Sequence, residues 1–224
     1  MSFKSFILRE IQRQLPPLGN KRVAIGARAY MKDIAPFLGV KTPPRRKLSH
    51  EIFSLAGTPT SDELGTTARA LWKLDEREYQ YVGYDLIGYF IESANKSFLA
   101  DHVEYLLTHK SWWDTVDSLG NNAVSPLTIR YNLLPLMNKW NRSSNMWLNR
   151  AAIGHQRGRK MDTDIPLLLK YCDDHSGNHE FFIAKAIGWA LRDLAKFDRT
   201  SVNKFLASHP DLDRIAVREA RRHE

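Results

Sequence analysis

The sequence has a single cysteine, no long apolar run and almost no strand-type alternation of apolar and polar residues. One cysteine, Cys172, excludes an internal disulfide and every zinc site built from several cysteines, and its apolar surroundings predict a buried, inert thiol. No run of about 18 apolar residues is present, and the N-terminal stretch MSFKSFILREIQRQLPP has the pattern of an amphipathic helix. We therefore expect a cytoplasmic protein without a secretory signal or a membrane partner.

Common catalytic and phosphate-binding motifs are also missing. The patterns GxxxxGK[ST], GxSxG and HExxH do not occur. His175 and His179 have the spacing of two metal ligands on a helix, but the segment HSGNH is typical of a turn and no third ligand accompanies it. We therefore predict neither a metal nor a cofactor.

The sequence is rich in hydrophobic residues and in positive charge. Its 224 residues, 43% of them hydrophobic, are enough for one large domain or two small ones, and we predict a single domain over residues 1–224. Thirty-three Lys and Arg against 25 Asp and Glu give a net charge of +8, which favours a nucleic acid or another anionic partner. The basic clusters KRVAIGARAYMK, KTPPRRK and HQRGRK are spread along the chain, so a folded face should meet that partner.

Most of the chain has helical periodicity, interrupted by Pro, Gly and polar turns. Four aromatic residues, Tyr79, Trp113, Trp147 and Phe181, are spaced 34 residues apart, and the same offset places the triplet AIG of 152–154 on that of 186–188. Repeats of this length are typical of stacked helix pairs. We predict an all-α fold, a curved solenoid of antiparallel helix pairs (HEAT-like repeats) with a concave basic groove.

The stretch SWWDTVDSLG contains two tryptophans beside two aspartates. Ser111 and Asp114 match a capping box, which predicts a helix that begins at Trp112. On this helix a buried stripe at i, i+4, i+7 and i+11 would consist of Trp112, Val116, Leu119 and Ala123.

A second face of the same helix presents Trp113 and Asp117, four residues apart. An aromatic ring and a carboxylate together suit a cation, with the ring contributing about 0.5–2 kcal/mol. The structural alternative is that Asp117 pairs with a nearby arginine and that Trp113 is simply packed.

Two further segments repeat an aromatic followed by an arginine three residues later. WLNRAAIGHQ contains Trp147 and Arg150, and FFIAKAIGWALRDLAK contains Trp189 and Arg192. Because equivalent helices of a solenoid line the same groove, these side chains are expected to face one channel that also holds Asp117.

These motifs, together with YMKDIAPFLGVKTPPRR upstream and IAVREA near the end, resemble the AlkD-like DNA alkylation repair family of HEAT-like-repeat DNA glycosylases, over about residues 20–220. The resemblance implies an active site of Trp113, Asp117 and Trp189. It also implies DNA contacts by Arg150, Arg192 and Tyr30, and we add Lys185, which is one turn before Trp189, as a phosphate contact. Lys185 is also the candidate for the amine nucleophile that many glycosylases use.

The resemblance further implies hydrolysis of the N-glycosidic bond of cationic purines such as 3-methyladenine and 7-methylguanine, in base excision repair. Such a base leaves as a neutral purine, so no general acid is needed, and Asp117 would stabilise the sugar cation and place a water. Trp113 and Trp189 would cradle the cation. The expected partner is duplex DNA, bound by a monomer whose groove stays open.

Three departures from the family pattern affect DNA affinity and lesion range more than chemistry: Asn149 replaces a basic residue, Leu194 replaces a tyrosine, and GHQRGRKMD is more polar than expected. Two other functions stay open. One is a non-catalytic HEAT-like binder of branched or distorted DNA, which would have no need of Trp113, Asp117 and Trp189. The other is a helical-repeat adaptor for an acidic protein, which would lack salt-sensitive DNA affinity.

Overall fold

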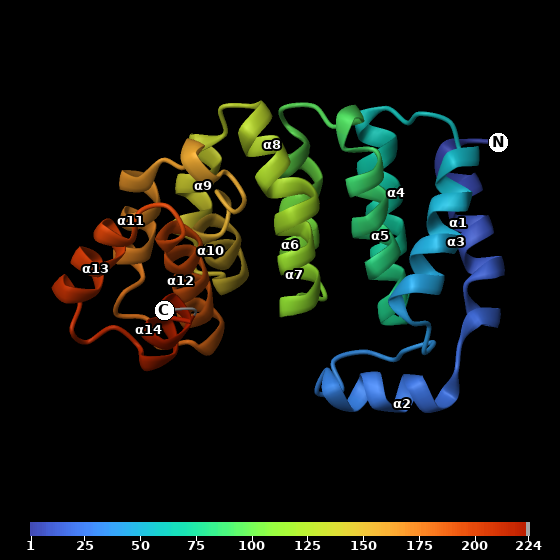
Figure 1. The fold of residues 1–224 in the computed structure, drawn as a ribbon. Helices are drawn as coiled ribbons and strands as arrows, with labels where there is room; N and C mark the ends of the chain where they lie inside the picture. Colours follow the sequence, from blue (N-terminus) through green and yellow to red (C-terminus); the bar gives the residue numbers. More distant parts are fainter. Residues whose placement is uncertain (223–224) are drawn as a thin grey trace. The chain divides into compact units, whose positions relative to one another are not determined.

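A computed structural model describes residues 1–222, and every regular element in that range is helical (Figure 1), which confirms the predicted all-α class. The helices form two compact units, Met1–Lys110 and Ser111–Glu224. The single domain over 1–224 stays a prediction. Over the described residues, no helix combines the length and the apolar character needed to cross a membrane.

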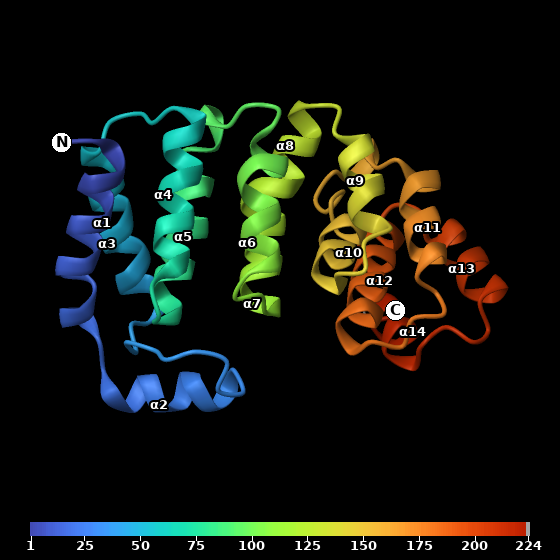
Figure 2. The same ribbon diagram turned by 180° about the vertical axis from the view of Figure 1, so that it is seen from behind.

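Unit 1 begins with the amphipathic helix that the N-terminal sequence predicts. Phe3, Ile7 and Ile11, spaced by one turn, are buried where α1 packs on α3 and α4. The helix α2 differs, because it has no buried residue and runs across the ends of the other long helices of this unit (Figures 1 and 2). The elements of unit 1 are α1 (Phe3–Gln14), η1 (Pro16–Leu18), α2 (Lys21–Tyr30), α3 (Thr42–Leu55), α4 (Ser61–Lys73), α5 (Arg77–Tyr89), η2 (Ile91–Ser93), η3 (Leu99–Val103) and α6 (Glu104–Thr108).

Unit 2 is organised around α10 and α12. The helix α10 contacts α7 on one side and α12 on the other, and α12 packs most extensively on α14. Cys172 is fully buried and burial raises the pKa of its thiol, as expected for an unreactive cysteine. The elements of unit 2 are α7 (Trp113–Leu119), η4 (Gly120–Val124), α8 (Ser125–Arg130), α9 (Leu134–Asn141), α10 (Met146–Ile153), η5 (Lys160–Asp162), α11 (Ile165–Asp174), α12 (Phe181–Ala195), α13 (Arg199–Ser208) and α14 (Arg214–Ala220).

The start of α7 differs from the prediction by one residue. The helix begins at Trp113, and its N-cap is Trp112 in extended conformation with no side-chain cap, so the capping box predicted at Ser111 is wrong. The reason is tertiary packing: the Trp112 ring lies 5.2 Å from Phe182 and 6.0 Å from Trp147, which holds this residue outside the helix. A complete capping box occurs instead at the start of α4.

The 34-residue spacing of aromatic residues coincides with helix starts. Tyr79, Trp113, Trp147 and Phe181 each lie within the first three residues of α5, α7, α10 and α12, as predicted. Hydrogen bonds within unit 2 also join residues one such interval apart, for example His175 to Asn141 and Lys185 to Glu219. The AIG triplets differ, because the first ends α10 and the second lies in the middle of α12.

Candidate active site

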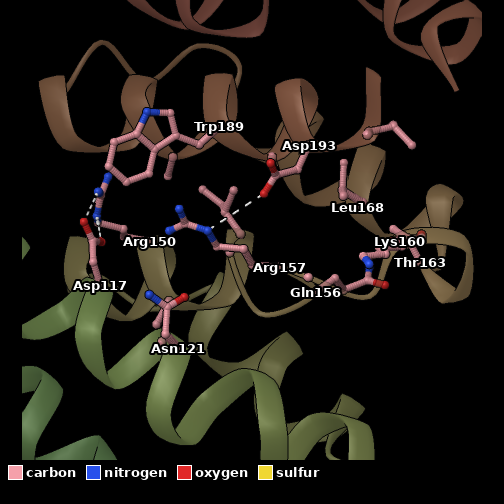
Figure 3. Close-up of a pocket in the computed structure, with 18 of the residues that line it drawn as sticks. Asp117, Asn121, Arg150, Gln156, Arg157, Lys160, Thr163, Leu168, Trp189 and Asp193 are labelled. Carbon is pink, nitrogen blue, oxygen red and sulfur yellow. Dashed lines mark hydrogen bonds and ion pairs between the residues drawn. The ribbon is translucent and has the colours of Figure 1, made fainter. Parts of the chain in front are cut away.

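A cavity of about 580 Å³ opens within unit 2, between α7, α10, α12 and the loop that follows α10 (Figure 3). Its walls are largely apolar, with Ile153, Ala186 and Leu194 among the lining residues. Asp117, Arg150 and Trp189 meet at one end, on α7, α10 and α12, and α10 contacts both of the other helices (Figure 3). Cavities of this size that combine apolar walls with placed polar groups are typical of ligand sites.

Asp117 and Arg150 form a bidentate ion pair at that end of the cavity (Figure 3). Nε and Nη2 of Arg150 each donate to one carboxylate oxygen at 2.8 Å, and Nη1 donates to the carbonyl of Phe182. The Arg150 side chain is 4% exposed and that of Asp117 is 21% exposed. The ion pair of the structural alternative is therefore present, and its carboxylate still reaches the cavity surface.

Trp189 presents its ring to cations. The guanidinium carbons of Arg150 and Arg157 lie 4.9 and 5.4 Å from the ring centroid, and Arg192 and Lys185 lie at 5.9 and 6.0 Å. The indole Nε1 donates to Glu219 at 3.1 Å. A half-buried ring with this environment attracts positive charge through its face.

The other predicted site residues differ in how close they lie to Asp117, Arg150 and Trp189. Trp113 is half-buried at the first position of α7, one turn before Asp117, but it is not among the residues that line the cavity. Lys185 and Arg192 flank Trp189 on α12, and both pair with Glu219, at 2.6 and 3.1 Å. Tyr30 belongs to unit 1, where it ends α2 and is 71% exposed.

The family model for the DNA alkylation repair enzyme matches residues 11–223. The chain belongs to the DNA alkylation repair enzyme family. No match is found among curated proteins.

Two solved structures are similar to this chain. A predicted DNA alkylation repair enzyme from Enterococcus faecalis is 29% identical, with 92% of this chain and 96% of that chain covered and a TM-score of 0.85. AlkD2 from Streptococcus mutans is 15% identical over 99% of both chains with a TM-score of 0.66, a likeness of fold alone.

The departures from the family pattern have structural explanations. Asn149 is buried, and its amide donates to the carbonyls of Trp140 and Asn141 in the last turn of α9 and of Ser143 just after it, a role that a charged side chain would not fill. Leu194 is buried in the cavity wall. The polar segment 154–162 forms the loop that closes one side of the cavity.

The sequence analysis did not predict three residues of this site, Arg157, Asp193 and Glu219. Arg157 lies over Trp189 and is 3.8 Å from Asp193 across the cavity mouth (Figure 3). Glu219 accepts the hydrogen bond from Nε1 at the edge of the Trp189 ring. The 34-residue spacing could have pointed to Glu219, because this residue follows Lys185 by that interval.

The two histidines considered as metal ligands have separate partners. Nε2 of His175 is 3.0 Å from the carbonyl of Asn141, and Nδ1 of His179 is 3.4 Å from Asp213. Over residues 1–222, no group of three or more His, Cys, Asp or Glu side chains is arranged to hold a metal ion.

Proposed function

We propose that this member of the family is a monofunctional DNA glycosylase that releases cationic N3- and N7-alkylated purines from duplex DNA. Family membership supports a role in DNA alkylation repair. The observation that carries the finer proposal is that the Asp117 carboxylate and the Trp189 ring line the same end of one cavity.

The proposed reaction breaks the bond between C1′ of the deoxyribose and N9 of the purine. The bonding electrons stay with the base, which carries a positive charge before the cleavage and leaves as a neutral purine. Water adds its oxygen to C1′ and loses a proton to the solvent. Because the leaving group needs no proton, the reaction requires only stabilisation of the sugar cation and a placed water.

Asp117 is suited to both tasks. Its two oxygens each accept one hydrogen bond from Arg150, which fixes the plane of the carboxylate and leaves further acceptor sites toward the cavity. Those sites can hold a water and face the developing charge at C1′. Arg150 thereby acts as the residue that orients Asp117, and its predicted contact with the DNA backbone remains a prediction.

Trp189 and Trp113 are proposed to cradle the cationic lesion. Four cationic side chains already surround the Trp189 ring, which supports its preference for positive charge. Arg157 is the more exposed of the two arginines that line the cavity, with 43% of its side chain exposed against 4% for Arg150. A cationic purine would take the place of Arg157 over the ring.

Duplex DNA is the proposed partner of a monomeric chain. The net charge of +8 favours phosphate binding, and Tyr30, Lys185 and Arg192 are proposed contacts. Such contacts make affinity fall steeply with salt.

The experiment measures free 3-methyladenine and 7-methylguanine released from methylated duplex DNA at low salt, for the wild type and for Asp117→Asn. We expect release by the wild type, about 100-fold slower release by the variant and unchanged affinity for DNA. Salt-dependent binding without release from either protein would contradict the enzyme and leave a binder of distorted DNA. The absence of DNA binding would favour an adaptor for an acidic protein.

A further inference from the structure

Glu219, in the last helix of the described chain, is a buried carboxylate with three donors. It lies on α14 with 4% of its side chain exposed. Oε1 accepts from Lys185 at 2.6 Å, and Oε2 accepts from Nε1 of Trp189 and Nη1 of Arg192, both at 3.1 Å. The hydrogen bond from Lys185 contributes most to lowering the pKa of this carboxyl.

The close approach of α12 and α14 places Glu219 at the Nε1 edge of the Trp189 ring. Gly188, the residue before Trp189, has no side chain, and a Cβ there would lie 2.5 Å from Cβ of Glu219 and 2.7 Å from the carbonyl oxygen of Ala216. A larger residue would force the two helices apart. The glycine thus brings the carboxylate within reach of all three side chains of α12.

These three side chains follow one another on α12 at four- and three-residue intervals and so share one face. Two of them, Lys185 and Arg192, are proposed phosphate contacts, and the third is the aromatic ring of the proposed active site. One buried carboxylate therefore connects the DNA-binding and the base-binding groups.

We propose that Glu219 is a positioning residue that fixes the Trp189 ring through Nε1 and competes with DNA phosphates for Lys185 and Arg192. The proposal rests on the proposed function for its catalytic part only. Removal of the Glu219 charge should have two opposite effects. Lys185 and Arg192 become available to DNA phosphates, so DNA binding tightens. The Trp189 ring loses the acceptor of its Nε1 hydrogen bond, so base release slows. A residue that only stabilises the fold would not move these two quantities in opposite directions.

The test compares Glu219→Gln with the wild type, because a glutamine offers one acceptor oxygen in place of two and turns an NH₂ group toward the donors. The matched control is Glu180→Gln, which removes the same charge from an exposed carboxylate at the N-cap of α12. The three readouts are affinity for an undamaged duplex as a function of salt, the single-turnover rate of base release, and the Trp189 fluorescence obtained by subtracting the spectrum of Trp189→Phe.

For Glu219→Gln we expect affinity for the duplex to rise by about threefold, with the slope against log salt steeper by about one. The release rate should fall by about tenfold, as expected when a positioned group loses its fixed geometry, and the Trp189 emission should change. In the Trp189→Phe background the same substitution should not slow release further. Agreement of Glu219→Gln with Glu180→Gln in all three readouts would overturn the proposal.

If Glu219→Gln does not fold, Glu219→Asp is used in its place. It keeps the charge but shortens the side chain, so the salt slope should stay at the wild-type value while the release rate falls, and a wild-type rate would overturn the proposal. If the wild type itself releases no base, the proposed function fails, yet the binding and fluorescence readouts still decide whether Glu219 holds Trp189, Lys185 and Arg192.

Discussion

A buried arginine is paired with an aspartate in each unit, Arg45 with Asp85 and Arg150 with Asp117, and the two pairs differ in alignment and in access. In unit 1, Nη1 of Arg45 lies 3.0 Å from Oδ2 of Asp85, but among the described residues neither atom has a hydrogen-bond partner, and both side chains are at most 5% exposed. In unit 2, Arg150 makes two aligned hydrogen bonds to Asp117, which borders the cavity.

Both arginines also lie over an aromatic ring, so the two pairs share this contact as well. Arg45 is 5.0 Å from the ring centre of Tyr81, and Arg150 is 4.9 Å from that of Trp189. The same residue types therefore occur in two settings, one enclosed and one open to a cavity. What distinguishes a functional pair here is a carboxylate that is fixed by its partner and still faces space for a ligand.

Replacing each pair by apolar residues should give the largest difference. Arg45→Met with Asp85→Leu should leave base release unchanged and stability equal or higher, because a buried pair with poor geometry repays little of its desolvation. Asp117→Leu with Arg150→Met should reduce release by about 1,000-fold or more, since the sugar cation loses its counter-charge. Single-turnover assays measure the rate of base release, and urea unfolding measures the stability of each double variant. Equal loss of activity in both double variants would remove the distinction between the pairs.

Acidification should act with opposite sign on two buried groups, Asp85 in unit 1 and His155 in unit 2. Burial raises the pKa of Asp85 above 3.8, so the folded form of unit 1 takes up a proton more readily than the unfolded form and gains stability as pH falls through the folded pKa. In unit 2, burial lowers the pKa of His155 from 6.5 to about 4, so stability present above pH 6.5 is lost as pH falls toward 4. The loss amounts to about 3 kcal/mol.

Hydrogen exchange of peptides from each unit between pH 7 and 4 measures these changes separately. His155→Asn, which keeps a donor for the carbonyl of Ala152 but does not titrate, should abolish the acid-dependent loss in unit 2. Persistence of that loss in the variant would assign it to another group.

Aromatic substitutions beside each arginine should give the smallest difference. Trp189→Phe shrinks the ring face and removes the donor to Glu219, and we expect release to slow by about tenfold. Tyr81→Phe keeps the ring under Arg45, and release should stay within about twofold of the wild type, since the ring face is retained. An equal effect of both substitutions would show that the Trp189 ring has no special part in the reaction.

The sequence predicted the parts of this protein that depend on periodicity. The helical class, the buried stripe of Val116, Leu119 and Ala123, and the positions of Trp113 and Trp147 at helix starts all follow from spacing along the chain. The same offset relates Lys185 to Glu219, but periodicity alone does not say which side chains at that offset meet.

The details that the sequence did not predict depend on tertiary contacts. Trp112 is held outside α7 by rings of other helices, and Arg150 turns inward to Asp117 although a surface contact with DNA was expected of it. The cavity depends on a loop, 154–162, whose path contains the positive backbone angles of Gly158 and Lys160. No regular pattern encodes such a path.

The most direct test of the account compares two isosteric substitutions, Asp117→Asn and Asp85→Asn, in single-turnover release of 7-methylguanine from methylated duplex DNA. Each removes one carboxylate charge beside a buried arginine, so the two variants differ mainly in whether that charge borders the cavity. We predict a rate about 100-fold lower for Asp117→Asn and a wild-type rate for Asp85→Asn. Equal rates in the two variants, whether both slow or both fast, would contradict the claim that the carboxylate at the cavity performs the chemistry.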